Sequence, residues 1–244
     1  MPADAVIKVG SLEAGYSQSH VLFGVNFAAI ENQITVIVGP NGCGKSTLLK
    51  SIFGLTNIYS GDISYRSENI TGLEPHIIAR KKIAYLPQIK NVFANLTVME
   101  NLIMASYTLD SDTFRDRLPG IMKTFPELDK HRKSKANNLS GGQRQMLAMA
   151  MALIRQPKLL LFDEPTASLS PKLASEVLEK IKLVRREYDI TVVLVEQNIR
   201  QALSIGDRVY LLANGKNVFD GQASELLMHK DLGKMYLGTH QTDS

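Results

Sequence analysis

One stretch of nine residues combines glycines with a lysine and two hydroxyls in a spacing suited to phosphate chemistry. It reads Gly39-Pro40-Asn41-Gly42-Cys43-Gly44-Lys45-Ser46-Thr47. It matches the pattern G-x-x-x-x-G-K-[ST] and lies between an apolar run and a helix-forming run. The glycines let the backbone approach a ligand, and a helix start attracts anions. Lys45 can reach the β- and γ-phosphates, Ser46 can bind Mg²⁺ and Thr47 can bind a phosphate oxygen. The sequence therefore predicts a nucleotide-binding loop.

Two acidic residues follow a second apolar run. Asp163 and Glu164 come directly after residues 158–162, which we predict to form a buried strand. Asp163 is placed to hold Mg²⁺, whereas Glu164 is one residue further along and points in a different direction. Glu164 can accept a proton from the water that attacks the γ-phosphate. The alternative is a pair of acids that cap the following helix.

Glutamines follow two further predicted strands. Gln88 comes after residues 83–86, and Gln197 lies in the polar triplet that follows residues 190–195. Ligands of α/β sheets bind beyond the carboxyl ends of the strands, so Gln88 is placed to reach metal or water. Gln197 is expected to face the same ligand edge as Asp163. A simple polar turn residue is the alternative for Gln88.

A second helix start also has the features of an anion site. Ser140, Gly141, Gly142 and Gln143 precede a helical run over residues 144–155. Ser140 and Gln143 have the spacing of a capping box, and the paired glycines leave backbone N–H groups open to an anion. Either a second nucleotide binds in the same chain, or one site is shared between two subunits.

The elements that must position these residues indicate an α/β fold. Short strands at 6–9 and 21–28 predict an antiparallel sheet edge, where Tyr16 either stacks on adenine or packs against the sheet. The spacing predicts a strand at 61–65, a helix at 75–80, helices at 97–104 and 114–125, a hairpin turning at 214–215, short helices near 223–229 and 232–237, and a disordered tail over 239–244. Strand signals vanish for about fifty residues before the second helix start, which predicts a helical insertion in the α/β core.

The composition of the chain disfavours some classes of function. The chain has 244 residues, 44% hydrophobic and 21% charged, with a net charge of +4. These values are ordinary for a folded domain, and the weak, dispersed positive charge does not favour nucleic acid as a partner. Cys43 is the one cysteine, which excludes a disulfide framework and fits a reducing cytoplasm. We find no signal peptide and no apolar run long enough to cross a bilayer, so any membrane role is expected from outside the lipid.

Together these motifs resemble the ATP-binding subunits of ABC transporters. Residues 39–47 match the Walker A motif, Gln88 the Q-loop, residues 139–143 the signature motif and residues 159–163 with Glu164 the Walker B motif. The resemblance implies a P-loop NTPase (RecA-like) core with an N-terminal antiparallel β-subdomain and an inserted helical subdomain. The single ABC ATPase domain would divide into a catalytic core (6–88 and 156–238) and a helical part (89–155).

The resemblance also assigns roles and partners. It makes Tyr16 the adenine-stacking residue, and ATP and Mg²⁺ the cofactors. It implies a head-to-tail pair of ATPase subunits, identical or different, in which Ser140, Gly141 and Gly142 of one subunit contact the γ-phosphate held by the other. Membrane permease subunits would dock near residues 91–96, at the cytoplasmic face of the membrane, with an extracytoplasmic solute-binding protein as an indirect partner. Gln197 stands where many relatives have a histidine, so it can sense phosphate but not relay a proton.

Within this family the chain is most similar to the ATPases of branched-chain amino acid importers. This similarity rests on four stretches of the sequence. They are residues 71–80, residues 167–171, residues 195–198 and the ending Tyr236-Leu237-Gly238. It implies that ATP hydrolysis powers import of branched-chain or other hydrophobic amino acids. The sequence also resembles the ATPases of urea and amide importers and of lipopolysaccharide-type exporters, which are the alternatives within the family.

Two functions outside transport compete with this interpretation. One is a soluble ABC ATPase of DNA repair or translation, which the single short cassette disfavours. The second is a non-catalytic nucleotide-binding regulator, which the presence of Lys45, Asp163 and Glu164 disfavours.

Overall fold

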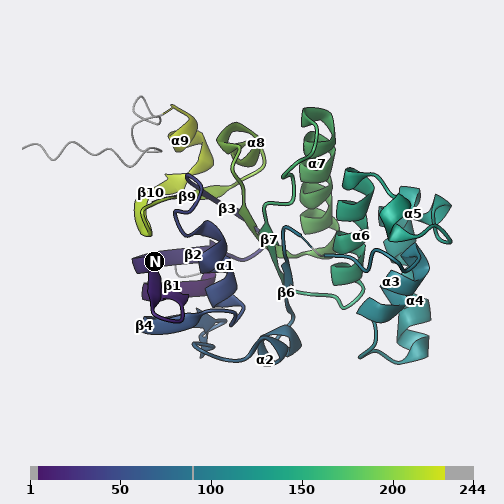
Figure 1. Ribbon diagram of the computed structural model, residues 1–244, viewed down its shortest axis with the longest axis horizontal. Helices are drawn as coiled ribbons and strands as arrows, with labels where there is room; N and C mark the ends of the chain where they lie inside the picture. The colour runs from purple at the N-terminus through teal and green to yellow at the C-terminus, as the bar shows by residue number, and fades with distance from the viewer. Residues whose placement is uncertain (1–4, 90, 229–244) are drawn as a thin grey trace, which may run out of the picture.

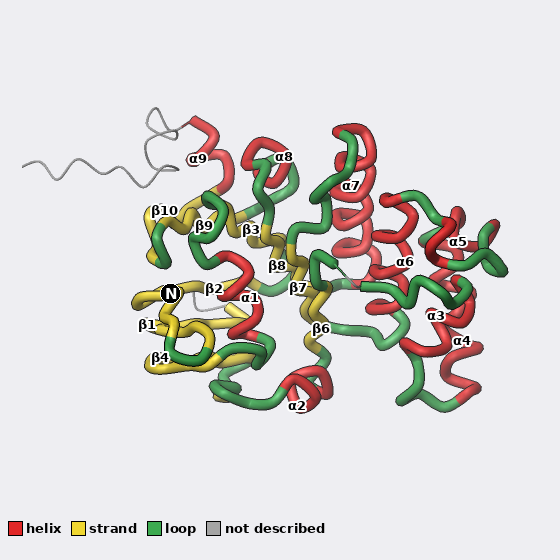
Figure 2. Tube along the Cα trace, in the orientation of Figure 1, coloured by secondary structure: helices red, strands yellow, loops and turns green. Residues whose placement is uncertain are grey.

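The computed structural model describes residues 5–89 and 91–228, which form two β-sheets and a group of helices to one side (Figure 1). Figure 2 shows the strands gathered in one half of the molecule and helices α3 to α6 in the other. The predicted α/β class with a helical insertion is thereby confirmed, since residues 98–153 form helices and turns without a strand. The domain limits at residues 88 and 155 stay a prediction.

The larger sheet is the framework of the core. In the described residues its strands are, in spatial order, β10 (Lys216–Gln222), β9 (Arg208–Ala213), β3 (Ile34–Val38), β8 (Thr191–Val195), β7 (Leu159–Asp163) and β6 (Ile83–Leu86). The strands from β9 to β6 run parallel, and β10 pairs antiparallel with β9. Every residue of β3, β7 and β8 is buried, which explains their continuous apolar runs. The carboxyl ends of these strands therefore share one edge of the sheet.

The smaller sheet contains the predicted antiparallel strands. Its described strands are, in spatial order, β2 (Ser19–Ile30), β1 (Ala5–Tyr16), β4 (Asn57–Tyr65) and β5 (Glu68–Asn69). Both β1 and β2 are longer than predicted. The register of β1 shifts between Val9 and Leu12, and Ser11 has a φ of 43°. Such a bulge breaks the alternation of buried and exposed residues from which a strand is predicted.

The described helices match the predicted helices within a few residues. They are α1 (Lys45–Ile52), α2 (Pro75–Arg80), α3 (Val98–Ala105), α4 (Ser111–Thr124), α5 (Pro126–Lys130), the 3₁₀ turn Ala136–Asn138, α6 (Gly141–Leu153), α7 (Pro171–Tyr188), α8 (Ile199–Leu203) and α9 (Ala223–Met228). Helices α5, α7 and α8 are not among the predicted helices, although Ser170 caps α7 and buried residues recur along α7 at helical spacing. None of the described helices is long and apolar enough to span a membrane.

The end of the chain is described only in part. The predicted hairpin is confirmed, because β9 and β10 are joined by Asn214 and Gly215, both with positive φ as a type I′ turn requires. The predicted helix at 232–237, the ending at 236–238 and the tail at 239–244 lie outside the described residues.

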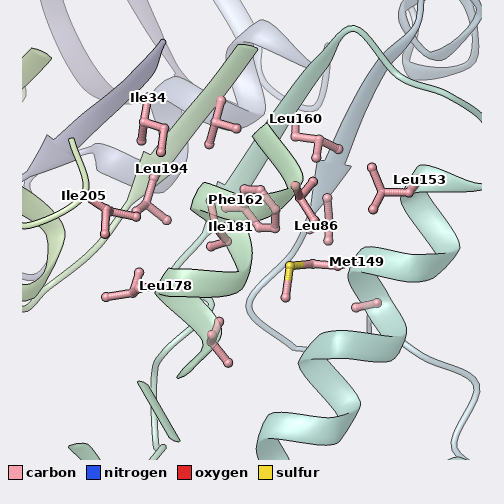
Figure 3. Close-up of a cluster of buried hydrophobic side chains, with 14 of the residues drawn as sticks. Ile34, Leu86, Met149, Leu153, Leu160, Phe162, Leu178, Ile181, Leu194 and Ile205 are labelled. Carbon is pink, nitrogen blue, oxygen red and sulfur yellow. The ribbon is translucent and has the colours of Figure 1, made fainter. Parts of the chain in front are cut away.

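Helices α6 and α7 cover one face of the larger sheet. Figure 3 shows Leu160 and Phe162 of β7 beside Ile181 of α7 and Met149 of α6. The residues that alternate with these along β7, Leu159 and Leu161, belong instead to a second buried cluster that includes α1 and the smaller sheet. Burial of both faces fixes the position of β7, and with it the two acids at its end.

Candidate functional site

The glycine-rich loop joins β3 to α1. Gly39 follows β3 with a φ of 150°, and a Cβ atom at this position would lie 2.1 Å from the backbone oxygen of Leu212. Gly44 precedes α1 with a φ of 104°. A side chain at either position would strain or displace the loop, so glycine is needed at both ends. The loop thus presents the first turn of α1 at the edge where the parallel strands end.

Lys45 lies in the interior of this loop. Its side chain is 4% exposed, and its ammonium donates hydrogen bonds to the backbone oxygens of Gly39 (2.9 Å) and Pro40 (3.1 Å). The same ammonium lies 3.8 Å from Oε1 of Glu164. The cation is therefore held where an anionic ligand of the loop would meet it.

Asp163 connects the loop to two strands. Its Oδ1 accepts a hydrogen bond of 2.6 Å from the Ser46 hydroxyl on α1, and its Oδ2 accepts one of 2.9 Å from the Tyr85 hydroxyl on β6. Burial, together with the negative charge of Asp163, raises the pKa of Tyr85 far above its ordinary value, so Tyr85 remains a hydrogen-bond donor. Ser46 and Asp163 place a hydroxyl and a carboxylate side by side, which are ligands suited to Mg²⁺.

Glu164 is the point where the predicted strand-end residues meet. Its Oε2 accepts hydrogen bonds from Gln197 Nε2 (2.8 Å) and Gln88 Nε2 (3.2 Å). Its backbone is in the left-handed region, with a φ of 48°, and its amide donates to the oxygen of Val195 (3.0 Å). The structure thus brings together Lys45 and the two glutamines around one buried carboxylate.

Tyr16 lies at the end of β1 with its ring partly exposed. The ammonium of Lys50, on α1, lies 6.0 Å from the ring centroid. The aromatic face is therefore beside the helix that begins in the glycine-rich loop. A planar base attached to a phosphate chain in the loop can stack on such a ring.

The second helix start is formed as predicted but is separate from this network. Ser140 and Gln143 make a capping box, with Ser140 N donating to Gln143 Oε1 (2.9 Å) and Gln143 N donating to Ser140 Oγ (3.2 Å). Apart from the backbone bonds of the helix, residues 140–143 of the described chain form hydrogen bonds with one another, with His131 and with Arg144. None of these partners belongs to the glycine-rich loop. In Figure 1 strands β6 and β7 lie between α6 and α1. One chain alone does not bring Gly141 and Gly142 to the glycine-rich loop.

Two residues of this region, the half-buried Tyr85 and the buried Glu196, were not predicted as site residues. Tyr85 appears in the sequence as an ordinary strand residue, and nothing in its spacing indicates Asp163 as its partner. Glu196 is 2% exposed, and its Oε1 accepts a hydrogen bond of 3.0 Å from the amide of Thr166. Burial raises the pKa of Glu196 to about 7. In the sequence, Glu196 is only the first residue of the polar triplet that follows β8, and nothing in the triplet indicates Thr166 as its partner.

Known proteins are similar to this chain in sequence and in fold. Residues 22–167 match the family model described as ABC transporter. A probable branched-chain amino acid transport ATP-binding protein of Archaeoglobus fulgidus is 49% identical over 96% of this chain and 99% of that protein. The high-affinity branched-chain amino acid transport ATP-binding protein BraG of Pseudomonas aeruginosa is 40% identical, over 91% of this chain and 95% of its own length.

Among solved structures, a dimeric ATP-binding cassette in a post-hydrolysis state with ADP and Pi is similar, with a TM-score of 0.76. It is 27% identical and covers 89% of this chain and 98% of that one. The same conclusion follows from the family match, from the relatives and from the arrangement of Lys45, Asp163 and Glu164. The chain belongs to the ABC transporter family, among its ATP-binding subunits.

Proposed function

We propose that this chain binds MgATP at residues 39–47, hydrolyses it with Glu164 as general base, and thereby powers amino acid import through membrane permease subunits. The observation that carries the proposal is the placement of Glu164. Its carboxylate lies 3.8 Å from the Lys45 ammonium and is held by two glutamine amides from the ends of β6 and β8. A carboxylate fixed beside a phosphate-binding lysine is suited to orient and deprotonate an attacking water.

Ser46 and Asp163 are the residues that would hold Mg²⁺, with Gln88 as a further ligand. A hydroxyl and a carboxylate fit this ion, which usually takes only one or two carboxylates from a protein and completes its shell with water and substrate phosphates. The described residues contain no cluster of three or more His, Cys, Asp or Glu that would favour a different metal. When bound, the ion neutralises charge on the phosphates.

Each residue around the phosphates then has a distinct task. Lys45 exchanges its contact with Glu164 for the β- and γ-phosphates and stabilises charge in the transition state. Gln88 and Gln197 orient the Glu164 carboxylate. Because a glutamine amide does not titrate near neutrality, Gln197 does not relay the proton. Catalysis therefore rests on positioning, on charge stabilisation and on Glu164 as the proton acceptor.

The active site is a half-site that a second ATPase subunit, identical or related, completes head to tail. Ser140 and Gly141 begin α6 away from Lys45 of the same chain, and the backbone amides at this helix start suit an anion. Pairing brings this helix start to the γ-phosphate held by the other subunit. ATP binding then favours closure of the pair, and hydrolysis permits opening. The dimeric relative with ADP and Pi supports this arrangement.

A groove beside the predicted docking segment suits the permease subunits. Its volume is about 440 Å³, and its lining includes the exposed side chains of Phe93, Met104 and Tyr107. The buried Asn101 side chain shapes the rim, because it accepts from the amide of Phe93 (2.7 Å) and donates to its oxygen (3.0 Å). A short apolar helix of a permease fits such a surface. The chain would then act at the cytoplasmic face of the membrane, indirectly linked to a solute-binding protein.

Branched-chain amino acids are the proposed cargo because the relatives at 49% and 40% identity carry that description over almost their whole length. The test is leucine uptake into cells that express this chain with its permease subunits and solute-binding protein. We expect uptake with the natural chain and none with Lys45→Ala, and competition by valine and isoleucine but not by arginine. Uptake that is indifferent to valine and isoleucine would contradict this cargo.

A further inference from the structure

Three consecutive residues at the end of β8 each bind the segment that contains Glu164. The oxygen of Val195 accepts from the amide of Glu164 (3.0 Å), Glu196 Oε1 accepts from the amide of Thr166 (3.0 Å), and Gln197 Nε2 donates to Glu164 Oε2 (2.8 Å). Two of these bonds hold the backbone and one holds the carboxylate. The conformation of residues 164–166 is therefore set from β8 rather than from β7 alone.

The backbone of Glu164 needs such support. A non-glycine residue with a φ of 48° is strained and keeps that conformation only where its surroundings impose it. A pocket of about 210 Å³ that is open to solvent lies beside it, lined by Glu164, Thr166, Glu196 and Gln197 among others. Because side chains do not fill this space, packing alone leaves residues 164–166 room to move. Hydrogen bonds must supply the constraint.

We propose that Glu196 is a positioning residue for hydrolysis: by holding the Thr166 amide it keeps the backbone of residues 164–166 in the conformation that directs the Glu164 carboxylate to the phosphate site. Thr166 is buried, and removal of the carboxylate takes away the acceptor that its amide has in this structure. The inference rests on the proposed role of Glu164 as the base.

The chemistry of this hydrogen bond predicts which substitutions preserve it. The bond needs an acceptor oxygen at the reach of a glutamate side chain, and it does not need the negative charge. The pKa of about 7 agrees, because at neutral pH the carboxyl is present in both forms and each keeps an oxygen that can accept. Glutamine is therefore expected to replace Glu196, whereas alanine lacks the acceptor and aspartate is too short.

The experiment measures steady-state ATP hydrolysis by the full chain with Glu196→Gln, Glu196→Ala and Glu196→Asp. We expect Glu196→Ala and Glu196→Asp to lower kcat about tenfold or more, as loss of a buried hydrogen bond does, with the KM for ATP within about threefold of the natural value. Glu196→Gln is expected to keep kcat within about threefold. The aspartate variant keeps the charge and serves if the alanine variant does not fold.

Thr191→Val is the matched control. Thr191 lies at the other end of β8, is buried, and its Oγ1 accepts a hydrogen bond of 3.0 Å from the amide of Asn32. This substitution removes a similar acceptor from the same strand, far from Glu164, and is expected to leave kcat unchanged. An equal loss of kcat in Thr191→Val and Glu196→Ala, natural kcat in Glu196→Ala and Glu196→Asp, or failure of Glu196→Gln to restore kcat would each overturn the inference.

The inference and the proposed function are separated by Glu164→Gln. If Glu196 acts through Glu164, adding Glu196→Ala to Glu164→Gln does not lower the residual single-turnover rate further. A further loss as large as that of Glu196→Ala alone would show that Glu196 acts independently and would overturn the inference while leaving the base in place. Natural hydrolysis by Glu164→Gln alone would instead refute the proposed function.

Discussion

Replacing Glu164 with glutamine separates ATP binding from ATP hydrolysis. The amide has the same shape and keeps an acceptor oxygen for Gln88 and Gln197, but it cannot take a proton. General base catalysis contributes roughly 10²- to 10⁴-fold, so we expect kcat to fall by that factor, which is about 3 to 5 kcal/mol of barrier height. The loop and its lysine are untouched by the substitution.

The same change is expected to preserve or strengthen ATP binding. Lys45 lies 3.8 Å from the Glu164 carboxylate, and at an effective dielectric constant of about 20 such a pair attracts by about 4 kcal/mol before desolvation is counted. The neutral amide frees Lys45 for phosphate and removes a negative charge beside the ligand. Closed pairs of subunits should then accumulate with ATP.

Two assays on purified Glu164→Gln measure these effects. Single-turnover release of phosphate gives the chemical step, and binding of a fluorescent ATP analogue gives affinity, with sedimentation velocity to follow pairing. Hydrolysis within about threefold of the natural rate would refute Glu164 as the base. Loss of nucleotide binding would refute the argument about its charge.

Three further substitutions test single contacts. Gln197→Ala removes a 2.8 Å hydrogen bond to Glu164 and should lower kcat about tenfold in steady-state assays; an unchanged kcat would show that this contact is idle. Tyr85→Phe removes one donor from Asp163 and should raise the Mg²⁺ concentration for half-maximal hydrolysis about tenfold, whereas the same Mg²⁺ dependence would argue against the assignment. Burial raises the pKa of Glu196 from 4.5 to about 7, so the folded chain binds more protons than the unfolded chain between these values. Its free energy of unfolding should therefore fall relative to Glu196→Gln as pH rises through this window, by about 3 kcal/mol in urea titrations; parallel pH curves would contradict this.

Features that depend on the spacing of neighbouring residues were predictable from the sequence. The glycine-rich loop, the helix at 75–80, the Ser140–Gln143 capping box and the turn at 214–215 each depend on residues within a few positions of one another. The meeting of Gln88 and Gln197 at Glu164 was also foreseeable, because parallel strands end at one edge of a sheet.

Contacts that depend on strand order were not predictable in this way. Tyr85 meets Asp163 because β6 pairs with β7, and Glu196 meets Thr166 because β8 lies between β7 and β3. No local pattern encodes which strands are neighbours. The lengths of β1 and β2 were missed for a different reason, since the bulge near Ser11 interrupts the alternation that marks a strand.

The central claim is that one chain holds only half of an ATP site. Lys45→Ala disables the loop of a subunit, and Ser140→Arg disables its second helix start, so each variant alone should be inactive. A mixed pair contains one site with both defects and one site with neither. The decisive measurement is single-turnover ATP hydrolysis by the two variants mixed in equal amounts. We predict that the mixture regains hydrolysis that neither variant has alone. A mixture no more active than its separate components would contradict the shared site.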